Sequence, residues 1–194
     1  NLVQNAAEAT IYVYDVIDAD WGVGAKDVIA AIAEVKDAKV LNIHINSPGG
    51  DVFEGRAIME AIKRFDGKTV AHIDSLAASA ATSIALAADE VVMSDGALFM
   101  IHNASGLVWG DKNAMRDTAN LLEKVEGSIV NDYTSKTGKD AADIVDMMNA
   151  ETWMTAQEAL DNGFIDRIVT TGKPKNAWNL ASFSNVPSMP EPEP

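Results

Sequence analysis

The sequence predicts an α/β fold with a mainly parallel sheet. Strand-like and helix-like segments alternate through the first half of the chain, and a Gly-rich turn joins one strand to the next helix. Strands that alternate with helices favour parallel pairing, because each crossover needs a connection long enough to hold a helix. With 194 residues, 47% of them apolar and 23% charged, the chain has the size and composition of one globular domain.

The alternating pattern occupies the first hundred or so positions. β-branched and aromatic residues alternate in TIYVYDV and VLNIHI, which predicts two strands. The second strand ends at NSPGG, and a helical pattern follows it. The predicted strands cover residues 10–16, 40–45, 69–73, 90–93 and 97–100, and the predicted helices cover residues 28–36, 52–65 and 79–88.

The second half begins with one long amphipathic helix, about residues 112–136, followed by Gly138 as a stop. Helices over 141–149 and 156–162 and a strand over 164–169 follow. We expect residues 1–171 to form one domain. The apolar residues of the long helix recur at spacings of three and four: Met115, Ala119, Leu122, Val125, Ile129 and Tyr133.

A C-terminal extension, residues 172–194, has a different composition. Its last eight residues, PSMPEPEP, contain four of the six prolines, which favour an extended and flexible chain. Residues 172–185 carry aromatic side chains at Trp178 and Phe183 without a steady period. This stretch is either a docking arm or a linker, and the pattern favours a linker.

Charge and composition argue against several functions. The net charge of −14 opposes general binding to nucleic acids or anionic membranes. The absence of cysteine excludes disulfides and thiolate chemistry, and no motif supports a metal or an organic cofactor. The longest uncharged apolar run is too short to cross a bilayer, and no signal peptide is visible, so a cytoplasmic location is expected.

Three features could carry chemistry. Gly49 and Gly50 allow the backbone to approach a ligand and present amide N–H groups to it, as an oxyanion hole requires. Ser79 lies among alanines at a helix start, where it is either a helix cap or a nucleophile; Ser75 and Ser83 are its rivals. Of three histidines, His102 follows a strand and is the favoured general base, whereas the other two alternate with apolar strand residues.

Four motifs together resemble the Clp protease proteolytic subunit (ClpP) family. They are INSPGG at 45–50, AAS at 77–79, MIH at 100–102, and TAQEA with NGFID at 155–166. The step of 29 residues from Gly50 to Ser79 is similar to the family's spacing, and the similarity covers about residues 10–169. The resemblance implies a ClpP/crotonase-like ββα spiral in which the long helix is the family's handle.

The resemblance also implies a role for individual residues. Ser79 would be the nucleophile and His102 the general base, with the amides of Gly50 and Ala80 as the oxyanion hole. Alignment on TAQEA places Glu151 at the position of the acid, where the family usually has Asp; Asp146 is the next candidate. The substrate would contact Gly49 and the strand formed by Phe99, Met100 and Ile101.

The resemblance implies a serine endopeptidase that cleaves polypeptides inside a homo-oligomeric chamber of hexameric or heptameric rings, single or stacked, without metal or cofactor. The acidic Pro-rich tail, and the lack of an obvious axial loop, favour a phage or prophage head maturation protease that acts on scaffold and capsid proteins in the host cytoplasm. A housekeeping Clp peptidase with an AAA+ unfoldase and an inactive capsid-associated shell are the alternatives. An acyl-CoA enzyme of the crotonase type would leave Ser79 and His102 without a role. A Ser/Lys peptidase would need a lysine as the base, and this chain has no lysine where that base is expected.

Overall fold

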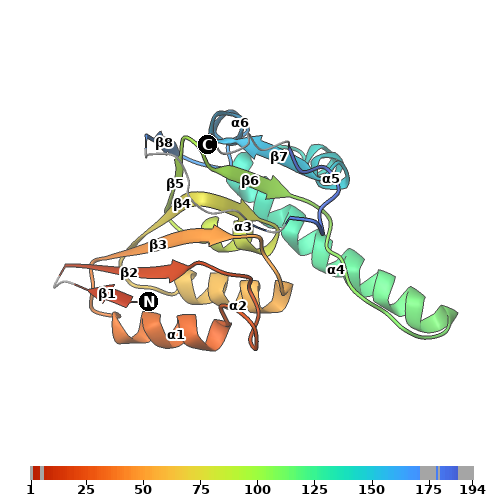
Figure 1. Ribbon diagram of the computed structural model, residues 1–194, viewed down its shortest axis with the longest axis horizontal. Helices are drawn as coiled ribbons and strands as arrows, with labels where there is room; N and C mark the ends of the chain where they lie inside the picture. The colour runs from red at the N-terminus through yellow and green to blue at the C-terminus, as the bar shows by residue number, and fades with distance from the viewer. Residues whose placement is uncertain (1, 5–6, 171–177, 179, 188–194) are drawn as a thin grey trace, which may run out of the picture.

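The computed structural model describes residues 2–4, 7–170, 178 and 180–187. These residues form one sheet of eight strands with helices on its faces and a long helix that projects from the body (Figure 1). The predicted α/β class with a mainly parallel sheet is therefore confirmed. Its strands are β1 Leu2–Gln4, β2 Glu8–Val13, β3 Val40–Ser47, β4 Lys68–Ala78, β5 Glu90–Ser94, β6 Leu98–Ile101, β7 Thr152–Thr155 and β8 Arg167–Val169.

The central strand β4 has two successive neighbours on one side. The sheet runs in the order β1-β2-β3-β4-β5-β8, and β6 pairs with both β4 and β7. Residues Val70–Ile73 of β4 pair with β5, whereas Leu76–Ala78 pair with β6. All these pairings are parallel except β1 with β2 and β6 with β7. The carboxyl ends of β3, β4 and β6 consequently meet at one edge, where open α/β sheets place their ligand sites.

Two helices cover one face of the sheet. The α1 helix, Ala25–Glu34, and the α2 helix, Val52–Lys63, lie side by side below the strands in Figure 1. Asp51 caps α2 by accepting hydrogen bonds from the amides of Phe53 and Glu54. The apolar stripes of the two helices pack against alternate residues of the strands, so the core lies between this helical layer and the sheet.

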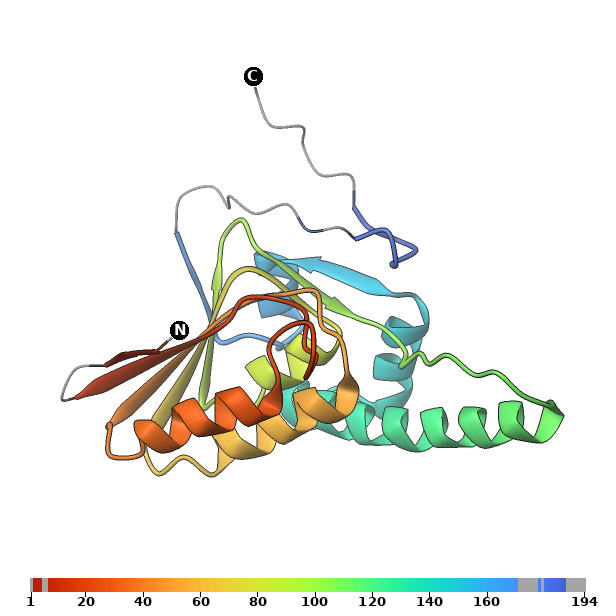
Figure 2. The ribbon, with the colours of Figure 1, turned by 60° about the horizontal axis from the view of Figure 1, so that its bottom comes forward.

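Four further helices complete the described part of the domain. They are α3 Ala80–Ala85, α4 Lys112–Thr137, α5 Ala141–Asn149 and α6 Ala156–Asp161. The chain runs outward along α4 and then returns as the helix itself (Figure 2). The α4 helix buries only Ile129, Val130 and Tyr133, all near its C-terminal end, so most of it has no support from the core.

The predicted elements differ from the structure mainly at the sheet. The prediction missed β1 and β7, and β4 continues five residues beyond the predicted end at Ile73. These segments owe their strand conformation to partners distant in sequence, since β7 pairs with β6. No helix among the described residues is long and apolar enough to span a membrane.

The described part of the C-terminal extension packs on the body. Trp178, Leu180 and Phe183 contact a small apolar cluster of Leu76, Ala78 and Met100. This arrangement matches a docking arm, the alternative that the sequence disfavoured. Flexibility was predicted for the whole extension, residues 172–194, of which residues 172–177, 179 and 188–194 lie outside the described residues.

Candidate active site

Ser79 occupies a strained turn between β4 and α3. Its backbone angles, φ 53° and ψ −127°, lie in a region that non-glycine residues rarely adopt. The Ser79 amide donates to the Met100 carbonyl at 3.0 Å, and the amide of Thr82 donates to the Ser79 carbonyl at 2.9 Å. These bonds hold a turn that presents the side chain at the carboxyl edge of the sheet. Strain of this kind, about 1–3 kcal/mol, persists where surrounding structure enforces it and is frequent at catalytic positions.

The Gly49–Gly50 turn lies directly against Ser79. The two glycines have φ values of +90° and +147°, which other residues adopt only with strain. A Cβ on Gly49 would lie 2.7 Å from Ser79 Cβ and 2.6 Å from the Ala78 carbonyl oxygen. A hydrogen bond also fixes the turn, because the Ile17 amide donates to the Gly49 carbonyl at 2.8 Å. Position 49 therefore requires glycine, because its backbone lies too close to the Ser79 turn to leave room for a Cβ.

Two main-chain amides beside Ser79 are available to a ligand. Within the described residues, neither the Gly50 amide nor the Ala80 amide donates a hydrogen bond. Amides near a nucleophilic oxygen can stabilise the negative charge that develops on a carbonyl oxygen under attack. The oxyanion hole at Gly50 and Ala80 stays a prediction, and the Gly49 turn that precedes Gly50 lies against both Ser79 and Ala80.

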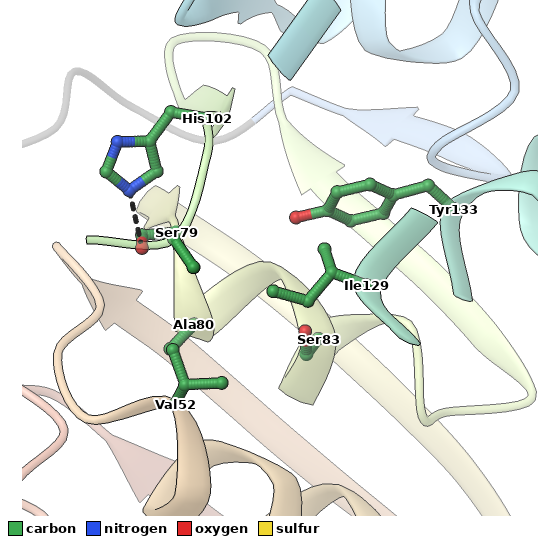
Figure 3. Close-up of a pocket in the computed structure, with 8 residues that line it drawn as sticks. Val52, Ser79, Ala80, Ser83, His102, Ile129 and Tyr133 are labelled. Carbon is green, nitrogen blue, oxygen red and sulfur yellow. Dashed lines mark hydrogen bonds between the residues drawn. The ribbon is translucent and has the colours of Figure 1, made fainter. Parts of the chain in front are cut away.

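His102 reaches Ser79 from the end of β6. Its Nε2 atom lies 2.8 Å from Ser79 Oγ, and Figure 3 shows the imidazole pointing at the hydroxyl. Burial lowers the pKa of His102 below its usual value of 6.5, while the nearby charge of Glu151 acts in the opposite direction. The imidazole is therefore neutral at pH 7 and able to accept the serine proton.

Glu151 lies near His102 but bonds to other groups. Its Oε1 accepts hydrogen bonds from Trp153 Nε1 at 3.1 Å and from the Asn185 amide at 2.6 Å, and its Oε2 accepts one from the Ser184 amide at 2.9 Å. Among the described residues no hydrogen bond joins Glu151 to His102. The carboxylate acts on the imidazole through its charge. Glu151 also has a positive φ of 48°, so its backbone is strained as well.

The pKa of Glu151 is lowered by the balance of several effects. Burial raises this pKa, but the amides of Ser184 and Asn185, the Trp153 indole and His102 together outweigh that effect and lower it. The carboxylate is therefore ionised at neutral pH. The alternative acid, Asp146, lies exposed on α5, and among the described residues it has no hydrogen bond to His102.

A small pocket adjoins the Ser79–His102 pair. It has a volume of about 20 Å³, close to that of one water molecule. Ile129 and Tyr133 of α4 face it from the side opposite Val52 of α2 (Figure 3). Tyr133 is buried, and its hydroxyl lies 2.7 Å from Thr82 Oγ1, which ties α4 to the helix that follows Ser79. The pocket is lined by Val52, Ser79, Ala80, Ser83, His102, Ala104, Ile129 and Tyr133.

The structure brings together Ser79, His102, Gly49, Gly50 and Ala80, and it places Glu151 near enough for its charge to act on the imidazole. The side chains of the predicted substrate-binding strand lie elsewhere. Phe99, Met100 and Ile101 are fully buried, and none of them lines the pocket.

The rival residues have other surroundings. His44 and His72 stack on each other at 4.5 Å on the sheet face opposite α1 and α2, where they bond to Asp74 and Asn42. Ser83 lines the pocket, but among the described residues the His102 imidazole bonds to Ser79 Oγ and no hydrogen bond joins a histidine to Ser83. Among the described residues no three His, Asp or Glu side chains are grouped so as to hold a metal ion.

Sequence reasoning missed the part of the site formed by Trp153 and the C-terminal segment. Phe183 packs edge-on against both His102 and Trp153, with ring centroids 5.5 Å and 5.6 Å away. The signal that could have indicated this contact is the pair of aromatic residues Trp178 and Phe183 in an otherwise polar stretch.

Known proteins match this chain over most of its length. The Clp protease family model matches residues 3–172. An ATP-dependent Clp protease proteolytic subunit 1 of Protochlamydia amoebophila is 30% identical over 168 residues, which is 83% of this chain and 80% of that protein. A corresponding proteolytic subunit of Streptococcus agalactiae is 30% identical over 69% of this chain and 70% of its own length.

A solved structure supports the fold independently. A mutant form of ClpP1 from Listeria monocytogenes superposes with a TM-score of 0.75, covering 84% of this chain and 92% of its own at 23% sequence identity. The expected ClpP-like architecture is thus shown by structure as well as by sequence. Together with the family match, these relatives establish that the chain belongs to the Clp protease family.

Proposed function

We propose that the protein is a serine endopeptidase in which Ser79 attacks the peptide carbonyl and His102 acts as general base. The observation that carries this proposal is the 2.8 Å contact between Ser79 Oγ and the Nε2 of a half-buried, neutral histidine. A serine hydroxyl needs such a base because it is a weak nucleophile at neutral pH.

The reaction would follow the usual course of acyl transfer. Ser79 Oγ forms a bond to the carbonyl carbon while His102 Nε2 takes the hydroxyl proton, and the oxyanion faces the free amides of Gly50 and Ala80. His102 then gives the proton to the departing amine, which breaks the C–N bond and leaves an acyl-enzyme. A water molecule, deprotonated by the same imidazole, hydrolyses that ester. Glu151 would stabilise the imidazolium through its charge.

Intact-mass analysis after fluorophosphonate treatment tests the proposal. We expect one adduct on the wild-type protein and none on Ser79→Ala, because the reagent phosphonylates only an activated serine. His102→Ala should react far more slowly while keeping its fold, as checked by circular dichroism. An unmodified wild-type protein, or an adduct that persists in Ser79→Ala, would contradict the assignment.

We also propose that the protein works as a ring-forming homo-oligomer that encloses the site. Large apolar side chains project from α4 and the chain that leads to it: Leu107 and Trp109 are fully exposed, and Met115 and Leu121 are half-exposed. Clustered apolar side chains on a projecting element favour contact with another molecule. Analytical ultracentrifugation of the wild type and of Leu107→Ser/Trp109→Ser would test this; a wild type that stays monomeric at assay concentration would contradict it.

The natural substrate has two candidates. The composition of residues 172–194 favours scaffold and capsid proteins of a phage, whereas the printed names of the relatives, ATP-dependent proteolytic subunits, favour unfolded polypeptides delivered by an AAA+ unfoldase. Purification of the Ser79→Ala protein from its native cell separates the two candidates. A retained capsid or scaffold fragment would support the first, and a retained unfoldase with ATP-dependent turnover would support the second.

A further inference from the structure

The C-terminal segment, defined here as Trp178 and residues 180–185, is anchored close to the catalytic groups. Trp178 Nε1 donates to the buried Asn46 Oδ1 at 2.7 Å, in the strand that leads to the Gly49–Gly50 turn. Asn185 Nδ2 donates to the Ala150 carbonyl at 2.9 Å, beside Glu151. The segment is therefore held at both ends by residues next to the site.

Apolar packing fixes the middle of the segment. Leu180 and Phe183 join Trp178 on a cluster of Leu76, Ala78 and Met100, and the Phe183 amide closes a turn by donating to the Leu180 carbonyl at 3.0 Å. Met100 and Ala78 are themselves fully buried. Specific side-chain packing of this kind distinguishes the segment from a solvated linker.

The segment touches both the base and the acid. The Phe183 ring meets the His102 imidazole at an interplanar angle of 66°, with 5.5 Å between centroids. The next two amides, of Ser184 and Asn185, donate to the two carboxylate oxygens of Glu151 at 2.9 Å and 2.6 Å. The consecutive residues 183–185 thus contact both the His102 imidazole and the Glu151 carboxylate.

The segment leaves the substrate pocket open. None of its described residues lines the pocket beside Ser79, and none bonds to the free amides of Gly50 and Ala80. A segment that blocked catalysis would be expected to occupy one of these places. The contacts are instead with the groups that must be held still: the half-buried His102 imidazole and the Glu151 carboxylate, whose backbone is strained.

We propose that the C-terminal segment is a positioning element of the active site, in which the Ser184 and Asn185 amides fix the Glu151 carboxylate and the Phe183 ring fixes the His102 imidazole. The proposal rests on the proposed function, since it assigns residues that act through its acid and base. Phe183, Ser184 and Asn185 touch no substrate.

Two variants of the full chain test this assignment. Phe183→Ala removes the ring from His102, and Ser184→Pro removes one amide donor from Glu151; Ser184→Ala is the matched control, because it loses the hydroxyl and keeps the amide. Each is assayed for hydrolysis of a short fluorogenic peptide across pH and for the rate of fluorophosphonate labelling. The His102 titration is followed by NMR of labelled histidine, assigned with His102→Gln.

We expect Phe183→Ala to lower kcat by about tenfold or more with little change in KM, because misplacement of reacting groups is costly while the pocket is untouched. Loss of the covering ring should also raise the pKa of His102 towards its usual value, since burial is the main cause of its lowering. The acidic limb of kcat/KM should then move to higher pH. Ser184→Pro should lose kcat relative to Ser184→Ala.

Several results would overturn the assignment. Faster labelling or hydrolysis in Phe183→Ala would make the segment an inhibitory cover, and lower activity with an unmoved His102 titration would make its role merely structural. Equal kcat for Ser184→Pro and Ser184→Ala would show that the amide hydrogen bond to Glu151 does not position the carboxylate. The NMR titration reports the Phe183 contact even in an inactive protein. If Phe183→Ala shifts the pKa of His102 while the wild-type protein never labels at Ser79, the proposed function is refuted and the contact of Phe183 with His102 stands.

Discussion

Gly49→Ala is the sharpest test of how closely the glycine turn must approach Ser79. An added Cβ would lie 2.6 Å from the Ala78 carbonyl oxygen and 2.7 Å from Ser79 Cβ, whereas ordinary contacts begin near 3.4 Å. One obstructing atom is a backbone oxygen and the other is a Cβ, so neither can move away by a side-chain rotation. The turn must therefore shift by roughly 0.8 Å, and a displacement near 1 Å can cost about 10²-fold in rate.

The substitution should affect catalysis more than folding. Displacing the Gly50 amide weakens one donor of the proposed oxyanion hole, and loss of such a donor costs about 10²–10³-fold in kcat. The positive φ of 90° adds backbone strain, which we estimate at about 1–2 kcal/mol of the free energy of unfolding. We expect a folded protein with kcat reduced about 10²-fold and KM nearly unchanged.

The assay is steady-state hydrolysis of a short fluorogenic peptide, together with urea unfolding of the same preparation. Gly127→Ala is the matched control, because a Cβ at that position of α4 meets no atom within 4 Å. The control should keep its kcat and gain up to about 1 kcal/mol from higher helix propensity. A folded Gly49→Ala protein with wild-type kcat would refute the reasoning.

Three further predictions concern His102, Glu151 and the pocket. Burial lowers the pKa values of His102 and His72, so the unfolded chain binds protons at these residues more readily than the folded chain does. The free energy of unfolding, measured in urea, should therefore fall as pH drops below 6.5. In rate profiles across pH, kcat/KM should stay high down to the lowered pKa of His102. Glu151→Gln should lower kcat about tenfold to a hundredfold and lower the pKa of His102 in a histidine NMR titration, because the opposing charge is lost; a loss near 10⁴-fold would instead indicate a direct bond to the imidazole during turnover. Ile129→Ala should widen the pocket and raise kcat/KM for peptides with Leu before the cleaved bond by about tenfold relative to those with Ala; an unchanged ratio would show that Ile129 does not limit substrate size.

The sequence predicted those parts of the molecule that depend on local pattern. The alternation in VLNIHI and the NSPGG turn indicated a strand followed by a helix, and β3 and α2 occupy those positions. His102 was a candidate because it follows a predicted strand, and Ser79 was a candidate because it lies among alanines at a predicted helix start. In the structure both residues follow strand ends, those of β6 and β4. Parallel pairing then brings these two strand ends together.

The parts that were missed depend on distant partners. The β7 strand is short and pairs with β6, so its own four residues carry little signal. The contacts of Phe183 with His102 and of Ser184 with Glu151 join residues far apart in the chain through ring packing and main-chain amides, which leave no periodic pattern. The burial of Phe99 and Met100 likewise depends on distant partners, because Phe99 packs against Phe164 and Met100 packs against Trp178, Leu180 and Phe183.

The uneven burial of α4 divides that helix into two parts under different evolutionary constraints. Its C-terminal part holds Ile129 and Tyr133 against the pocket, so substitutions there alter the interior of the same subunit. Its N-terminal part, with Met115 and Leu121 half-exposed, contacts no core of its own. Across relatives, variation in the N-terminal part should follow changes in the molecules that the protein meets, and variation in the C-terminal part should follow changes in what it cleaves.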